Sequence, residues 1–193
     1  MRGIQRTIGV VGTLLAVCMP LAAQNDIIIN GERVTQQAIA AELAQYGVPL
    51  NTPIAPGEYW YDEVSGLWGY AGGPTVGQVL PGLDVGGRLR SNASGGGTGV
   101  FLNGREIHQL EYVYLYRLYG YVIPGRYWLN AQGVGGPEGG PAMFNLVAAA
   151  RQAGMGGGGG GGGYNRRSLF GDTGSDGNCF YYNHPGGSSV SNC

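Results

Sequence analysis

The pattern of apolar and polar positions is nearly the same in two parts of the chain. Residues 27–29 and 100–102 are short β-prone apolar runs, and an Asn-Gly pair follows each run. Apolar residues then recur at helical spacing over 36–46 and 109–119, and a glycine ends each stretch. The two segments align without a gap, so the pattern predicts one helix in each.

The residues that begin these helices support the same interpretation. Thr35 is a good N-cap, and His108 aligns with it. The second segment is rich in tyrosine, which leaves a strand as the alternative there. The alanines of the first segment favour a helix in both.

A Pro-Gly pair and a Tyr-Trp pair follow each predicted helix. In the first copy the pattern predicts a β-hairpin, with strands over 59–62 and 67–70. In the second copy Gly135 stands where the first has Trp68, so we expect its second strand to be weak or absent. A Gly-Gly-Pro sequence ends both copies, and 142–153 reads as a short final helix.

These elements predict an α+β protein in which two tandem, related β-α-β-hairpin units pack as one small domain. Eight consecutive glycines form a linker to a tail that is disordered or closed by a disulfide. We therefore divide the chain as follows: 1–23 signal peptide, 24–90 first unit, 91–98 linker, 99–153 second unit with its terminal helix, 154–163 poly-Gly linker, and 164–193 cysteine-containing tail.

The first 23 residues have the pattern of a bacterial secretory signal peptide, since two arginines precede an apolar stretch and small residues end it. We therefore expect an exported protein, whether periplasmic, on the cell surface or extracellular, with no transmembrane segment in the mature chain. In that compartment Cys179 and Cys193 are expected to pair, although pairing between chains remains open.

Charge and composition exclude several classes of function. The chain has 11 basic and 12 acidic residues, and its arginines are scattered, so it has no footprint for nucleic acid. Its two histidines, His108 and His184, stand apart without carboxylate ligands at metal-binding spacing, so we expect neither a metal nor a cofactor. Opposite charges stand at matched positions, such as Glu58 and Arg126, so we expect these side chains either to pair across the interface between the units or to be solvated.

Aromatic side chains are the best candidates for a binding site: Tyr59, Trp60, Trp68, Tyr127 and Trp128. Neighbouring residues on a strand face opposite ways, so one member of each Tyr-Trp pair is expected in the core and the other outside. The alternative is that each tryptophan packs centrally while the tyrosine covers the sheet. Because Trp68 has no counterpart, we expect any ligand groove nearer the first unit.

These observations favour a secreted, non-catalytic binding module that recognises a cell-envelope polysaccharide or protein through exposed aromatic side chains. A self-assembling surface or matrix protein is the alternative, because glycine- and tyrosine-rich chains can associate through strands. A small extracellular hydrolase that uses Glu106 and His108 is the third hypothesis, since acid-base catalysis needs such groups together.

Overall fold

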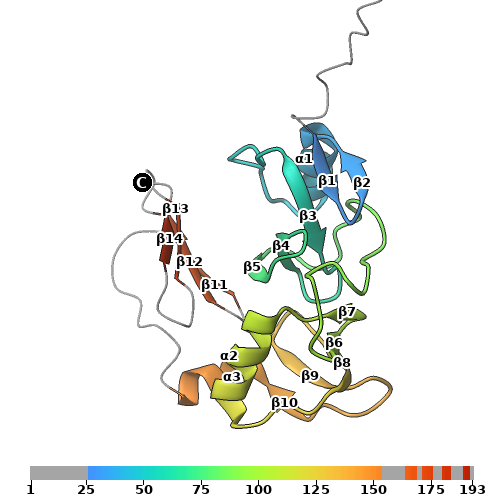
Figure 1. Cartoon of the computed structure of the whole chain (residues 1–193). Helices are drawn as coiled ribbons and strands as arrows, with labels where there is room; N and C mark the ends of the chain where they lie inside the picture. Colours follow the sequence, from blue (N-terminus) through green and yellow to red (C-terminus); the bar gives the residue numbers. More distant parts are fainter. Residues whose placement is uncertain (1–25, 154–163, 169–170, 176–179, 184–188, 192–193) are drawn as a thin grey trace, which may run out of the picture.

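The computed structural model describes residues 26–153 and four shorter segments, 164–168, 171–175, 180–183 and 189–191. In these residues it has two five-stranded mixed sheets, a four-stranded sheet and three helices, which confirms the α+β class (Figure 1). The predicted signal peptide, the poly-Gly linker, Cys179 and Cys193 lie outside the described residues.

The first sheet has the strand order β2-β1-β3-β4-β5. Its strands are β1 (Ile27–Ile29), β2 (Glu32–Val34), β3 (Gly57–Tyr61), β4 (Leu67–Tyr70) and β5 (Thr75–Gln78). Only the pairing of β1 with β3 is parallel, because helix α1 (Gln36–Gln45) carries the chain from β2 back to the start of β3.

The second sheet has the order β10-β9-β8-β6-β7 and again one parallel pair, β6 with β8. Its strands are β6 (Val100–Leu102), β7 (Arg105–Glu106), β8 (Gly125–Leu129), β9 (Val134–Pro137) and β10 (Phe144–Asn145). Helix α2 (Gln109–Tyr119) connects β7 to β8, and helix α3 (Leu146–Gln152) follows β10. The predicted final helix is therefore present but shorter than expected.

Both predicted helix starts are confirmed. Thr35 is the N-cap of α1, where its Oγ1 accepts the N–H of Ala38. His108 is the N-cap of α2, and Gly120 ends that helix in the left-handed conformation at φ +77°. Helix rather than strand in the tyrosine-rich segment follows from these two caps and from the buried face they orient.

The Asn-Gly turns hold both sheets together in the same way. Asn30 and Asn103 adopt positive φ values, 52° and 50°, and each side chain bonds the backbone of the strand beside it. Asn30 Nδ2 donates to Tyr61 O at 2.9 Å and Asn103 Nδ2 donates to Leu129 O at 2.8 Å. Each turn therefore fixes the end of one hairpin strand, as asparagine can in a left-handed position.

The second hairpin is complete, so the prediction of a weak or absent strand is wrong. β9 pairs with β8 in the register that β4 has with β3, and Gly135 stands opposite Leu129 as Trp68 stands opposite Tyr61. The ring of Phe144 from β10 lies over Gly135, where a side chain would collide with it. Phe144 then contacts Tyr127 at 6.1 Å between ring centroids, the distance that separates Trp68 from Tyr59.

One hydrophobic cluster joins the two sheets. It contains Trp60 and Leu67 from the first sheet together with Val100, Leu102 and other side chains from the second. A second cluster, around Ile27, Ile29, Ile39, Tyr59, Tyr61 and Leu83, lies between the other face of the first sheet, α1 and the loop after β5. Strand β3 is thus covered on both faces.

The tail, for which we expected disorder or a disulfide, contains four short antiparallel strands in its described segments. These are β11 (Tyr164–Ser168), β12 (Gly171–Ser175), β13 (Phe180–Asn183) and β14 (Ser189–Ser191), in sequential order. β11 and β12 lie against β5. The β-prone run Phe180-Tyr181-Tyr182 is a local signal for one of these strands.

Glu58 and Arg126 are both exposed and do not pair with each other across the interface, so of the two alternatives only the solvated one agrees with the structure. Arg126 bonds Glu138 on its own sheet at 2.7 Å, and Arg33 bonds Asp26 at 2.7 Å. Both pairs are largely exposed, so each contributes little. The reason is that matched positions lie on separate sheets, whereas partners within one sheet are close.

We predict that Asn103→Asp destabilises the protein more than Asn30→Asp does. Asn103 Nδ2 also donates to the buried carboxylate of Asp62 at 2.7 Å, so a second carboxylate there would face a like charge. Asn30 Nδ2 donates instead to two carbonyl oxygens, those of Tyr61 and Gly87. We expect a loss of about 3 kcal/mol or more for Asn103→Asp and about 1–3 kcal/mol for Asn30→Asp in urea unfolding at pH 7. Equal losses would contradict this view of Asp62.

Candidate functional site

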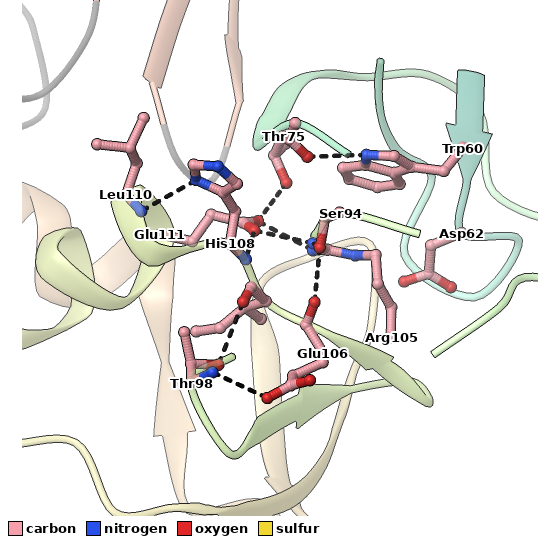
Figure 2. Close-up of polar contacts among 12 residues, drawn as sticks. Trp60, Asp62, Thr75, Ser94, Thr98, Arg105, Glu106, His108, Leu110 and Glu111 are labelled. Carbon is pink, nitrogen blue, oxygen red and sulfur yellow. Dashed lines mark hydrogen bonds and ion pairs between the residues drawn. The ribbon is translucent and has the colours of Figure 1, made fainter. Parts of the chain in front are cut away.

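A buried cluster of charged and polar side chains lies where the two sheets meet (Figure 2). Arg105 of β7 and Glu111 of α2 form a bidentate ion pair, with Nη1 to Oε2 at 2.8 Å and Nη2 to Oε1 at 2.9 Å. Both side chains are 1% exposed. An ion pair so deep in the protein requires further polar partners to offset the loss of water.

Those partners come from both sides of the interface. Thr75 of β5 donates its hydroxyl to Glu111 Oε1 at 2.6 Å, and Arg105 Nη1 donates to Ser94 Oγ at 2.7 Å. The Arg105 guanidinium also lies over the Trp60 ring, 4.0 Å from its centroid, in a cation–π contact. The cluster therefore ties the first sheet and the 91–98 segment to α2.

Glu111 also completes the N-terminus of its own helix. Its Oε2 accepts the backbone N–H of His108 at 2.7 Å, while His108 Nδ1 accepts the N–H of Leu110 at 3.1 Å, so the pair forms a capping box. Burial alone would raise the pKa of Glu111, but the Arg105 charge and the hydrogen bonds from Arg105, Thr75 and His108 hold it below its ordinary value.

Glu106, beside Arg105 in sequence, has a different role. Its Oε1 accepts the backbone N–H groups of Thr98 and Gly99 at 2.8 and 2.7 Å. The N–H bonds of Gly99, Gly97 and Thr98 lower the pKa of Glu106. Its carboxylate thus organises the glycine-rich loop before β6.

This arrangement does not provide acid-base chemistry. Both oxygens of Glu111 already accept two hydrogen bonds each, and His108 Nδ1 accepts a backbone N–H. Glu106 is bonded to its own loop. The hydrogen bonds of Glu111 and Glu106 thus hold the helix start and the loop before β6, which makes the cluster a structural junction.

The predicted aromatic residues are spread over both sheets. Tyr59 and Trp60 are both buried, and Trp60 is only 1% exposed, whereas Trp68, Tyr127 and Trp128 are half-buried. The expectation that one member of the Tyr59–Trp60 pair faces outward is therefore wrong, because β3 is covered on both faces. Trp60 Nε1 donates to Gly73 O and Trp128 Nε1 donates to Gly140 O, each at 3.1 Å.

An apolar cavity of about 220 Å³ lies against the second sheet, between β6, β8, the end of α2 and β10. No side chain in its lining carries a charge at neutral pH: Val100, Leu102, Leu115, Tyr119, Tyr121, Val122, Ile123, Tyr127, Met143, Phe144 and Leu146. We expected a ligand groove near the first unit and Trp68, but the apolar cavity lies in the second unit and Trp68 does not line it. A polar groove of about 910 Å³ lies between the two Asn-Gly turns, with charges of both signs along it.

Six of the nine exposed large apolar side chains in residues 26–153 lie either on α2 or at the rim of this cavity. On α2 these are Leu110, Val113 and Tyr116, which are 42%, 42% and 54% exposed and recur every three residues, along one side of the helix. Tyr121, Ile123 and Met143 at the cavity rim are 66%, 62% and 72% exposed. We call Leu110, Val113 and Tyr116 the outer face of α2.

Arg105 and Glu111 were not among the predicted site residues. The spacing of His108 and Glu111, an N-cap followed three residues later by Glu, is a capping-box signal that identifies Glu111 from sequence. Nothing local identifies its pairing with Arg105. Within 26–153 and the four tail segments, no cluster of His, Cys, Asp or Glu is arranged to hold a metal, and no helix there is long and apolar enough to cross a membrane.

We predict that Arg105→Met lowers the free energy of unfolding by about 3–5 kcal/mol, because Glu111 would remain buried without its counter-charge. The double variant Arg105→Met/Glu111→Leu is expected to regain most of that loss. Arg126→Met, which breaks the exposed pair with Glu138, serves as the control and should cost about 1 kcal/mol or less. Urea unfolding measures all three, and a double variant as unstable as Arg105→Met would contradict the prediction.

The pH dependence of stability gives a second test of the buried pair. Because the pKa of Glu111 is lowered in the folded state, its contribution is full above the ordinary value of 4.5 and is lost as pH falls through the folded pKa. The stability difference between the wild type and Glu111→Gln should therefore be constant from pH 7 to about 5 and shrink below 4.5. Thermal unfolding across this range measures it, and a difference that grows toward low pH would refute it.

Part of the chain is similar to two plant proteins. It is 38% identical over 117 residues to extra-large guanine nucleotide-binding protein 1 of Arabidopsis thaliana, and 34% identical over 117 residues to extra-large guanine nucleotide-binding protein 2. Each match covers 58% of this chain and 13% of the relative. No protein-family model matches the sequence, and no solved structure matches it.

These relatives overturn the predicted function and location. Both relatives are guanine nucleotide-binding proteins of a plant, so the predictions of a secreted bacterial envelope-binding module and of export to the periplasm, surface or medium are wrong. The matrix-protein and extracellular-hydrolase alternatives fall with them, and a polysaccharide partner has no support. The prediction of export depended on one local pattern, two arginines followed by an apolar run, and such a pattern alone does not determine where a protein is located.

Proposed function

We propose that residues 24–153 form a protein-interaction domain that serves a guanine nucleotide-binding signalling protein. The observation that carries this proposal is the outer face of α2, three large apolar side chains exposed on a helix whose inner face is buried. Apolar side chains that gather on one surface are typical of a protein-binding site. The similarity to two extra-large guanine nucleotide-binding proteins supports the signalling context.

The domain is proposed to consist of two related units, 24–90 and 99–153, joined by 91–98, with 154–163 as the linker to the tail. The recurring hydrogen bonds of Asn30 and Asn103, and of Trp60 and Trp128, support this division. The corresponding helix α1 has Gln37, Ala40 and Leu43 where α2 has Leu110, Val113 and Tyr116, and Leu43 packs against the cluster around Ile27. The binding surface therefore belongs to the second unit.

We propose that this domain does not bind the nucleotide, and that another part of such a protein does. The sequence has no lysine, so it lacks the Gly-Lys-Ser/Thr ending of a phosphate-binding loop. The partner is instead a protein segment with an apolar face, most simply an amphipathic helix that lies against α2. The half-buried Trp68, Tyr127 and Trp128 stay predictions as ligand contacts.

Selection from a random peptide library displayed on phage tests the outer face of α2. The bait is the full chain, compared with the variant Leu110→Ser/Val113→Ser/Tyr116→Ser. Peptides enriched on the wild type should bind this variant at least about tenfold more weakly, because the apolar contacts are gone.

The control variant is Gln37→Ser/Ala41→Ser/Ala44→Ser, which alters exposed positions of α1, and it should bind those peptides like the wild type. Circular dichroism verifies that both variants are folded. A peptide set that binds all three proteins equally, or no enrichment at all, would overturn the proposed function.

A further inference from the structure

The apolar cavity of the second sheet corresponds to a place that the first half of the chain fills by itself. Val100, Leu102 and Tyr127 line the cavity. Their matched residues, Ile27, Ile29 and Tyr59, belong to the cluster against which Leu50 packs. In one copy Leu50 packs, half-buried, against the cluster that these strand residues form, and in the other a cavity lies beside the matched residues.

The cause is a difference in length between two connections. Residues 46–56 connect α1 to β3, whereas only residues 120–124 connect α2 to β8. Tyr59 Oη donates to Ala55 O and Tyr127 Oη donates to Ile123 O, which sets the alignment of the two connections at their ends. The additional residues of the longer connection are therefore 48–52, and Leu50 is among them.

The shorter connection is also held less firmly. In the first half, Gln36 clamps Ile54: its Oε1 accepts the N–H of Ile54 and its Nε2 donates to the carbonyl of Ile54. Gln109 stands at the matched position, but it donates to Gly97 O instead. Val122, which matches Ile54 and lines the cavity, therefore does not have the clamp from Gln109 that Ile54 has from Gln36.

The lining selects the chemistry of the occupant. Because no lining residue is charged, a charged ligand would lose its hydration without a counter-charge. Burial raises the pKa of Tyr119, the tyrosine at the end of α2, so it too is neutral. The exposed Tyr121, Ile123 and Met143 at the rim supply apolar surface around the opening.

We propose that this cavity is an anchor site for an extended peptide segment of a partner protein, which inserts one leucine-like side chain where Leu50 packs in the first half. The site deepens the proposed function, since it gives the partner a second contact beside α2. A peptide with the sequence of residues 47–55 can serve as the probe, because it contains Leu50 with its own neighbours in the chain.

The experiment titrates the full chain with a capped peptide of residues 47–55 and follows the methyl signals of Val100, Leu102, Leu115 and Leu146 by NMR. A peptide that carries Leu50→Asp is the matched control. We expect binding at about millimolar affinity for one buried side chain, and at least about tenfold weaker binding for the control peptide. Shifts that are absent, that lie away from the cavity, or that are equal for both peptides would overturn the proposal.

A second variant keeps the test independent of folding. Inserting residues 48–52 between Gly120 and Tyr121 gives the second connection its own leucine, so it should abolish peptide binding and raise the melting temperature. An inserted chain that is folded and still binds the peptide would also overturn the proposal. The outer-face variant of α2 should retain peptide binding at the cavity.

The two proposals therefore fail separately. If no library peptide binds the outer face of α2 but the Leu50 peptide binds the cavity, the anchor site stands and the proposed function is refuted. If library peptides bind the outer face of α2 but the Leu50 peptide does not bind the cavity, the proposed function stands and the anchor site is refuted. Binding of neutral small molecules to the cavity, with no preference for the Leu50 peptide, counts against the peptide anchor.

Discussion

The buried ion pair between Arg105 and Glu111 is the interaction on which the arrangement of the two sheets depends. Each charge is stable in the interior only while the other is present, and only while Thr75, Ser94 and Trp60 complete the surroundings. These partners come from the first sheet and from the segment between the sheets. Sliding the first sheet over the second would therefore break the Thr75 hydrogen bond and the Trp60 cation–π contact, and would leave the buried ion pair without these partners.

The two halves share a framework but use it differently. The position of Arg105 is occupied by Glu32 in the first half, and that of Glu111 by Ala38, so the ion pair exists only once. The aromatic contact with the strand tyrosine survives, although Trp68 provides it in the first half and Phe144, from another strand, provides it in the second. The hydrogen bonds of the Asn-Gly turns recur because they hold the strands of each half together, whereas the side chains that pack on those strands differ between the halves.

Local features of the fold were predictable from sequence, and long-range ones were not. The caps Thr35 and His108 act on the next few residues, and an alignment of two copies is sufficient to find them. The strand β9 was missed because its glycines lack side chains of their own, and the ring that covers them comes from Phe144, which is distant in sequence from β8. Arg105 was not predicted as a site residue for the same reason: its burial depends on Trp60 and Thr75, whose proximity no local pattern reveals.

The position of the ion pair also decides which surface is left for a partner. Because Glu111, Tyr114 and Leu115 hold one side of α2 against the core, the helix cannot rotate to hide Leu110, Val113 and Tyr116. In α1 the matched positions are Gln37, Ala40 and Leu43, and Leu43 packs against the cluster around Ile27 and Ile29. Because the helix has a fixed orientation, these apolar side chains stay in water, and that exposure is unfavourable in free energy unless another surface covers them. The interaction that fixes the fold is thus also the one that keeps this face available for binding.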